Sequence, residues 1–107
     1  MATADQMYDE ASQLKDQGDL AGAVAKLREV LVIDPRHVLS HQALAVYLQK
    51  LGEYDDAIQH ARQVVEIEPQ DPFSYTQLSV IYQRCGRIPE AEDAMARAHT
   101  LQQGHRH

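Results

Sequence analysis

The feature that most constrains this chain is the regular spacing of its glycines. Gly18, Gly52 and Gly86 lie 34 residues apart, and the segments around them, "DQGDLAGAV", "KLGEYDDAI" and "RCGRIPEAE", align without a gap. Alanines keep the same period, at Ala23, Ala57 and Ala91. A period of about 20–50 residues is typical of a stacked repeat array rather than of a domain with one central core.

Each period contains two helical patterns with the glycine between them. Apolar residues recur every three or four positions on both sides of the glycine, and glycine suits the reversal because it accepts a left-handed backbone. Pro35 and Pro69 end the second helix of their periods, since proline disfavours helix in the preceding residue. Asp71 with Pro72, and later Pro89, suit helix starts. The expected helices are residues 4–17, 20–33, 38–51, 54–67, 72–85 and 88–102.

A helix–turn–helix unit of 34 residues with these features resembles the tetratricopeptide repeat, or TPR. The second repeat carries most of the family pattern, in Leu44, Ala45, Leu48, Gly52, Tyr54, Ala57 and Pro69. The resemblance implies an all-α solenoid of three TPR units, six antiparallel helices in a right-handed superhelix. The expected repeats are 4–37, 38–71 and 72–105, in a single domain over 1–107 with a short disordered C-terminal tail.

Departures from the family pattern gather at the two ends of the array. Glu10 stands where Leu44 and Leu78 occupy the corresponding place, and Glu92 and His99 replace apolar residues in the last helix. Terminal repeats need a polar outer face because no neighbour covers them. We therefore expect a three-repeat array capped at both ends. An apolar strip remains on the last helix and is either residual exposure or a self-association face, at Met95, Ala98 and Leu101.

Composition excludes several classes of protein. The net charge is −6 and the pI about 5.4, which argues against nucleic acid or an anionic membrane as partner. The start "MATADQMYDE" lacks the apolar core of a secretory signal, and no apolar run is long enough to span a bilayer. Cys85 is the single cysteine, so an internal disulfide is impossible and a cytoplasmic location is expected.

The resemblance also implies a binding surface. In TPR proteins the first helix of each pair lines the concave side, and positions 2, 5, 6, 9, 12 and 13 of the repeat face the ligand. In the first repeat these positions hold Asp5, Tyr8, Asp9, Ser12, Lys15 and Asp16. In the second they hold Leu39, Gln42, Ala43, Val46, Gln49 and Lys50, and in the third Phe73, Thr76, Gln77, Val80, Gln83 and Arg84.

One well-known TPR ligand is excluded. Repeats that grip the C-terminal carboxylate of chaperones use Lys, Asn and Arg at five of these positions, which here hold Tyr8, Ser12, Ala43, Phe73 and Gln77. Without cationic or amide donors, a buried carboxylate would lack partners. The chaperone carboxylate motif is therefore not an expected partner.

The groove that remains has an apolar floor, a wall of glutamines and a basic rim. Glutamine amides can satisfy the backbone of an extended peptide, and the rim of Lys15, Lys50 and Arg84 favours a ligand with acidic residues; an amphipathic helix also fits. Leu39 and Phe73, at the starts of their helices, either belong to this groove or pack against the preceding loop.

The residues that could carry chemistry have simpler interpretations. In "LGEYDDAIQH" the carboxylates of Asp55 and Asp56 suit a helix start, and nothing requires His60 to be a ligand. His37 and His41 need not share a face, and His41 occupies a core position. Cys85 is expected to be a structural thiol. His105 and His107 in the tail would bind metal only weakly.

The sequence thus predicts a non-enzymatic protein that uses no metal or cofactor. We expect an adaptor or scaffold that holds a peptide or protein segment in its concave groove. The alternative is a self-assembling module that oligomerises through its C-terminal helix face.

Overall fold

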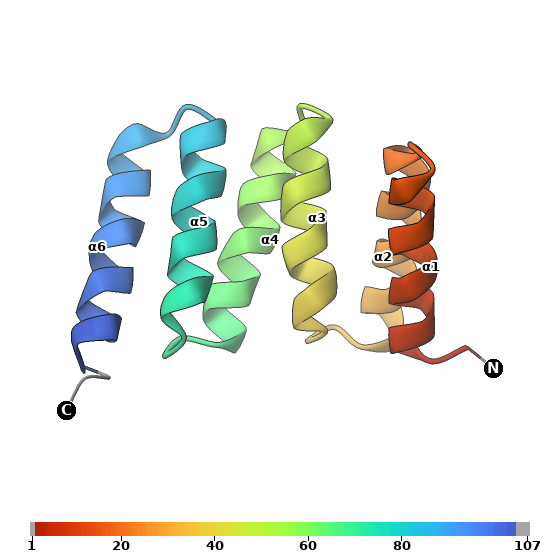
Figure 1. The fold of residues 1–107 in the computed structure, drawn as a ribbon, viewed down its shortest axis with the longest axis horizontal. Coiled ribbons are helices and arrows are strands. Elements are labelled where there is room, and N and C mark those ends of the chain that lie inside the picture. Colours follow the sequence, from red (N-terminus) through yellow and green to blue (C-terminus); the bar gives the residue numbers. More distant parts are fainter. Residues whose placement is uncertain (1, 105–107) are drawn as a thin grey trace.

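Six antiparallel helices form three hairpins in the computed structural model, which describes residues 2–104 (Figure 1). The first helices of the hairpins, termed A helices, are α1 (Ala4–Asp16), α3 (Val38–Lys50) and α5 (Pro72–Arg84). The second, termed B helices, are α2 (Leu20–Ile33), α4 (Tyr54–Ile67) and α6 (Ile88–Gly104). The described part of the chain contains no strand. The expected all-α solenoid is confirmed, with each A helix one residue shorter than predicted and α6 two residues longer.

The turns within the hairpins depend on the three periodic glycines. Gly18, Gly52 and Gly86 have φ of 86°, 82° and 79°, a left-handed conformation that costs other L-residues steric strain. The amide of Gly52, for example, donates to the Gln49 carbonyl at 3.0 Å and so closes the end of α3. The repeat period therefore reflects a backbone requirement that recurs in every hairpin.

Side-chain caps define several of the helix starts. At α1, Thr3 accepts from the Gln6 amide while the Gln6 side chain accepts from the Thr3 amide, a reciprocal capping box. At α5, the Asp71 carboxylate accepts from the Phe73 amide at 3.0 Å, and proline occupies the first turn. Such caps each contribute on the order of 1 kcal/mol to helix stability.

The hairpins close on small residues and stack through leucines. Ala57, midway along the repeat, is fully buried and allows α3 and α4 to approach closely. Leu27, Leu44 and Leu48 are at most 1% exposed, and burying each contributes about 1.5–3 kcal/mol before the entropy cost. The core is therefore a continuous strip through the stack.

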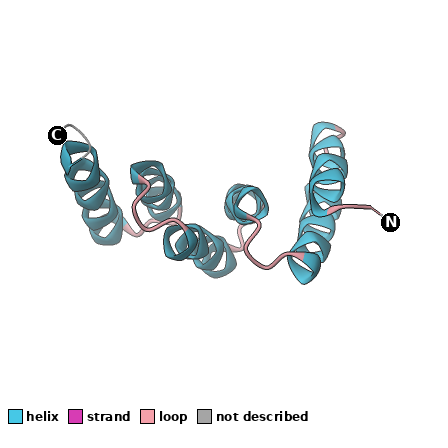
Figure 2. Cartoon of the chain, turned by 90° about the horizontal axis from the view of Figure 1, so that it is seen from below, coloured by secondary structure: helices cyan, strands magenta, loops and turns pink. Residues whose placement is uncertain are grey.

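Neighbouring hairpins pack B helix to A helix, α2 on α3 and α4 on α5. The A helices α3 and α5 also touch one another directly. Figure 2 shows the hairpins following a curved arc, with α3 and α5 towards its inner side and α4 towards its outer side. This arrangement leaves one face of α3 and α5 free of other helices.

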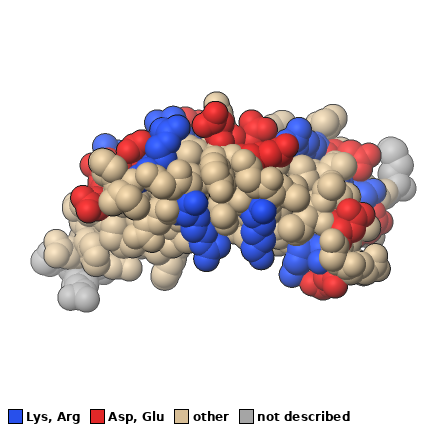
Figure 3. Space-filling view, turned by 90° about the horizontal axis from the view of Figure 1, so that it is seen from above, with Lys and Arg blue, Asp and Glu red and all other residues tan. Residues whose placement is uncertain are grey.

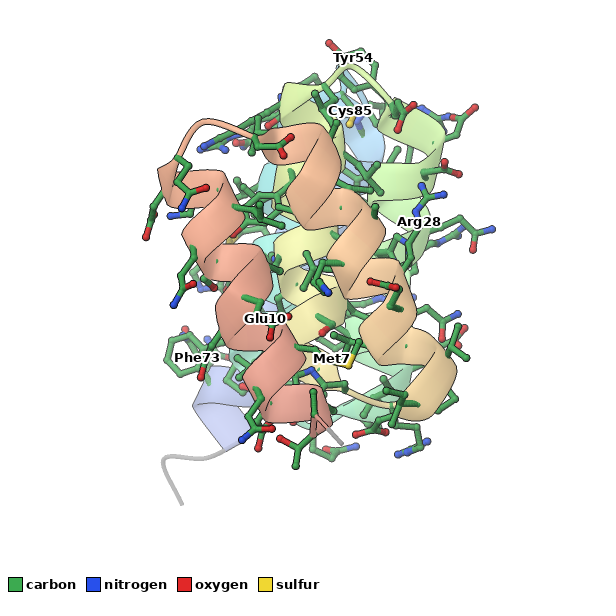
Figure 4. All side chains as sticks on the ribbon, turned by 90° about the vertical axis from the view of Figure 1, so that its right-hand side faces the viewer. Met7, Glu10, Arg28, Tyr54, Phe73 and Cys85 are labelled. Carbon is green, nitrogen blue, oxygen red and sulfur yellow. The ribbon has the colours of Figure 1, made fainter. Side chains whose placement is uncertain are left out.

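The first hairpin presents charged groups at its outer end. Glu10, where later repeats have leucine, accepts an ion pair from Lys26 of α2 at 3.2 Å, and Figure 4 shows it facing outward from α1. Tyr54 differs from the family expectation of a residue wedged between helices. It is 46% exposed and points away from the top of the stack (Figure 4), because it occupies the first residue of α4.

Candidate functional site

The predicted ligand-facing residues all reach the surface of the A helices. None of the residues at those positions in α1, α3 and α5 is buried. The other faces of the same helices supply core residues such as Ala11, Leu44 and Leu78. The A helices are therefore amphipathic across the stack, with the predicted positions on the uncovered side.

The two positions that open α3 and α5 are well exposed. Leu39 is 50% and Phe73 is 71% exposed, and Figure 4 shows Phe73 projecting on the side opposite to Arg28. These side chains are not packed against the preceding loop, so the packing interpretation is wrong for both. Beside Phe73 lies an open, mainly apolar hollow of about 860 Å³, to which Pro69 and Pro72 contribute.

The glutamine wall is smaller than the sequence suggested. Gln77 donates its side-chain amide to the Gln42 backbone carbonyl at 3.1 Å and thereby ties α5 to α3. Its Oε1 atom is buried without a partner, so Gln77 stabilises the groove floor rather than offering a free amide. The side chains of Gln42, Gln49 and Gln83 make no hydrogen bond to another described residue.

The basic rim contains one engaged residue and two unpaired ones. Lys15, Lys50 and Arg84 each lie in the last turn of an A helix. Asp16 contacts the Lys15 ammonium at 2.9 Å and raises the pKa of that lysine. Neither Lys50 nor Arg84 forms an ion pair with any residue the structure describes. In Figure 3 basic side chains project in a row from one long edge, away from most acidic groups.

The first A helix differs from the other two in charge. Asp5 accepts a contact of 2.9 Å from the His37 ring, which also lies 5.8 Å from the Tyr8 ring. His37 is the N-terminal cap of α3 and contacts Ser40 through its other nitrogen. This bridge fastens α1 to the loop before α3, and it explains why His37 does not join His41 in a metal site.

The apolar strip predicted on α6 is only partly present. Ala98 is 2% exposed, because it packs towards α5, so it cannot belong to an exposed association face. Met95 and Leu101 are half-buried. The strip is therefore narrower than the sequence indicated.

A histidine pair joins α3 to α4, and sequence reasoning missed it. The Nδ1 atoms of His41 and His60 are 2.9 Å apart, and His41 Nε2 donates to the Pro35 carbonyl at 2.9 Å. Because that carbonyl can only accept, neutral His41 must accept at Nδ1 from the His60 N–H. Burial, His41 and Arg28 lower the pKa of His60 to about 4. The predicted core role of His41, which is 5% exposed, is confirmed.

The remaining candidate groups show no assembled chemistry. Within residues 2–104 no group of three or more His, Cys, Asp or Glu side chains converges on a metal position. Cys85 caps the end of α5, and partial burial raises the pKa of its thiol, as expected for a structural residue. His105 and His107 lie outside the described residues. No helix in the described part is both long and apolar enough to cross a membrane.

A model of the tetratricopeptide repeat matches residues 14–76, more than half of the chain, and a second matches residues 74–103. The chain belongs to the tetratricopeptide repeat family. A search of curated proteins found no match.

Solved structures share this TPR fold. A crystal structure of MamA superposes with a TM-score of 0.85 at 19% identity, covering 95% of this chain and 60% of that one. MamA from Desulfovibrio magneticus RS-1 gives 0.78 at 26% identity, covering 92% and 55%. YrrB, a TPR protein with an unusual peptide-binding site, gives 0.82 at 18% identity, covering 98% and 54%. The chain thus spans less than two thirds of each of these longer proteins.

Proposed function

We propose that this protein is a non-enzymatic adaptor that holds a segment of a partner protein in the concave groove of α1, α3 and α5. Its role is to bring two macromolecules together rather than to transform a substrate. The TPR fold is in general a protein-interaction module, which agrees with this role. The described peptide-binding site of YrrB lends further support by analogy of fold.

The observation that carries the proposal is the uncovered face of α3 and α5. Folded chains normally bury side chains of this kind, yet Phe73 is 71% exposed and Leu39 50% exposed on the same side. Val46 and Val80 lie farther along the two helices and are half-exposed there. Adjacent exposed apolar residues on one face are typical of an interaction surface.

A charged substitution in the middle of the groove tests the proposal. Val46→Glu and Val80→Glu are expected to abolish partner capture in a pull-down, because each places an unpaired carboxylate on the apolar floor. The far-UV circular dichroism should be unchanged, since neither valine is fully buried.

The matched control is Val32→Glu, the same chemical change at a position on α2 that is 83% exposed and outside the groove. Partners that the Val32 variant and the wild type both retain, but the groove variants lose, identify groove ligands. Retention of every partner by Val46→Glu and Val80→Glu would contradict the proposed site.

A second candidate function is self-assembly through α6. The specific observation in its favour is that α6 packs only against α5 among the described helices, with Met95 and Leu101 half-exposed. Self-assembly predicts a mass in light scattering that rises with concentration and falls for Met95→Glu. A constant monomer mass at high concentration would eliminate this candidate.

A further inference from the structure

The two central A helices present the same order of side chains along their free face. Each begins with an exposed large apolar residue, continues through a half-exposed valine and ends with a cation in its last turn. Because α3 and α5 run in the same direction and touch, the matching residues form three rows across the seam between them. The rows are Leu39 with Phe73, Val46 with Val80, and Lys50 with Arg84.

The spacing of these rows follows from helix geometry. At a rise of about 1.5 Å per residue, the valine row lies about 10 Å and the cation row about 16 Å from the first apolar row. An extended peptide advances about 3.3 Å per residue. A peptide lying along the seam would therefore meet the three rows with its residues i, i+3 and i+5.

Charge decides what the third row accepts. The free face of α3 and α5 carries no acidic residue, and its two cations have no ion-pair partner among the described residues. In α1, by contrast, the Asp16 carboxylate already engages Lys15 at 2.9 Å. Carboxylates of a ligand would find charge-assisted partners only at the α3–α5 end.

The polar groups between the rows favour an extended ligand over a helical one. The side chains of Gln42, Gln49 and Gln83 have no partner among described residues, and amides of this kind satisfy the N–H and C=O groups of an extended backbone. A helix satisfies its own backbone groups and would leave these amides unused. The open apolar hollow of about 860 Å³ beside Phe73 offers space for the first apolar residue.

We infer that the groove selects an extended segment with large apolar residues at i and i+3 and a carboxylate at i+5, in either chain direction, lying along the α3–α5 seam. This inference rests on the proposed groove function and adds the chemical class of the ligand. The carboxylate belongs to an internal Asp or Glu side chain, so a free chain terminus is not required.

Selection from a phage-displayed library of random twelve-residue peptides tests this inference, because the peptides are fused at their C-termini and expose no terminal carboxylate. Wild-type protein should enrich the apolar–apolar–acidic spacing. Lys50→Glu/Arg84→Glu should instead enrich Lys or Arg at the third place. The control Arg36→Glu/Arg62→Glu makes the same charge change at two exposed residues outside the groove and should enrich the wild-type motif.

A synthetic, C-terminally amidated copy of the most enriched peptide then gives the affinity by fluorescence anisotropy. Lys50→Glu/Arg84→Glu should weaken it at least about tenfold, since two charge-assisted contacts become repulsive. Circular dichroism shows whether the double variant folds, and Lys50→Gln/Arg84→Gln, which avoids repulsion with the helix dipole, should still weaken binding if the first variant does not fold.

Three results would overturn the inference: no enriched peptide, enriched peptides without an acidic residue at this spacing, or a motif unaffected by the charge reversal. Loss of enriched peptides from Val46→Glu, combined with an unaffected motif in Lys50→Glu/Arg84→Glu, would leave the groove function standing and remove only the charge selection. The pull-down with Val46→Glu tests the groove function separately.

Discussion

The junction between repeats 1 and 2 and the junction between repeats 2 and 3 follow the same frame but are filled differently. At the first, His41 holds the Pro35 carbonyl and pairs with His60. The positions 34 residues later hold Tyr75 and Ala94, where an open groove of about 460 Å³ runs between α4 and α6. The loop there is held by the Ser74 hydroxyl instead, which donates to the carbonyls of Glu68 and Asp71.

The difference shows that the repeat frame does not set the packing on its convex side. A single position, His60 in one repeat and Ala94 in the next, determines whether a ring fills the space between successive B helices. The first junction is consequently titratable, since its polar contacts run through imidazoles, whereas the second relies on a hydroxyl that keeps its protonation state at any physiological pH.

The largest expected effect compares the same core position in the two junctions. Leu44→Ala should lower the free energy of unfolding by about 3–5 kcal/mol, because Leu44 is fully buried and the cavity cannot collapse easily. Leu78→Ala should cost less, about 2–3 kcal/mol, because Leu78 already lines the open groove. Urea denaturation followed by circular dichroism measures both, and equal costs would contradict the packing difference.

An intermediate effect concerns pH. The pKa of His60 in the folded protein is about 4, below the ordinary value near 6.5, so between these pH values the unfolded chain binds the proton more tightly. Stability from this group is therefore complete above pH 6.5 and is lost as the pH falls towards 4. The loss should be on the order of 2 kcal/mol, less than the full shift implies because part of the ring is solvated.

The opposing charges around His60 come from three helices. Arg28 of α2 and His41 of α3 disfavour its protonation, while Asp56 of α4 favours it. Carboxylates elsewhere also titrate in this range, so the measurement is the difference in unfolding free energy between pH 7 and pH 4.5. This difference should shrink in His60→Ala and stay unchanged in His99→Ala, an exposed histidine on α6. An identical pH dependence in His60→Ala would show that the pair does not control acid stability.

The smallest expected effect fills the groove of the second junction. Ala94→Leu should change the free energy of unfolding by less than about 1 kcal/mol, because Ala94 borders open space that can receive the new methyl groups. Ala61→Leu, at a fully buried alanine on α4, should destabilise by about 1–3 kcal/mol through overpacking. Thermal denaturation distinguishes the two, and a large loss in both would indicate that the groove is not available for a side chain.

Most of the fold could be predicted because its determinants are local. Gly52 needs a left-handed backbone wherever its neighbours fold, and Pro69 and Asp71 punctuate the chain through their own covalent chemistry. The prediction of helix ends was in error by one or two residues, since the last residue of a helix depends on which carbonyls find partners. The central role expected of Tyr54 was wrong because its place at a helix start exposes it.

The candidate site was less predictable, since its properties depend on neighbours distant in sequence. The exposed place of Phe73 and the free cations Lys50 and Arg84 agree with the expected positions. The engagement of Gln77 by the α3 backbone and the burial of Ala98 do not follow from the repeat pattern. Each depends on how closely two particular helices approach.

The sequence by itself determined that this chain forms three helical hairpins of the TPR family and which side of each A helix is free. These properties follow from periodicity, turn residues and polarity, which are written along the chain. Only the tertiary structure decided that His41 meets His60, 19 residues away, and that Gln77 reaches Gln42, 35 residues away. Hydrogen bonds and ion pairs act over about 3 Å, so their partners are set by the packing of helices rather than by spacing in the sequence.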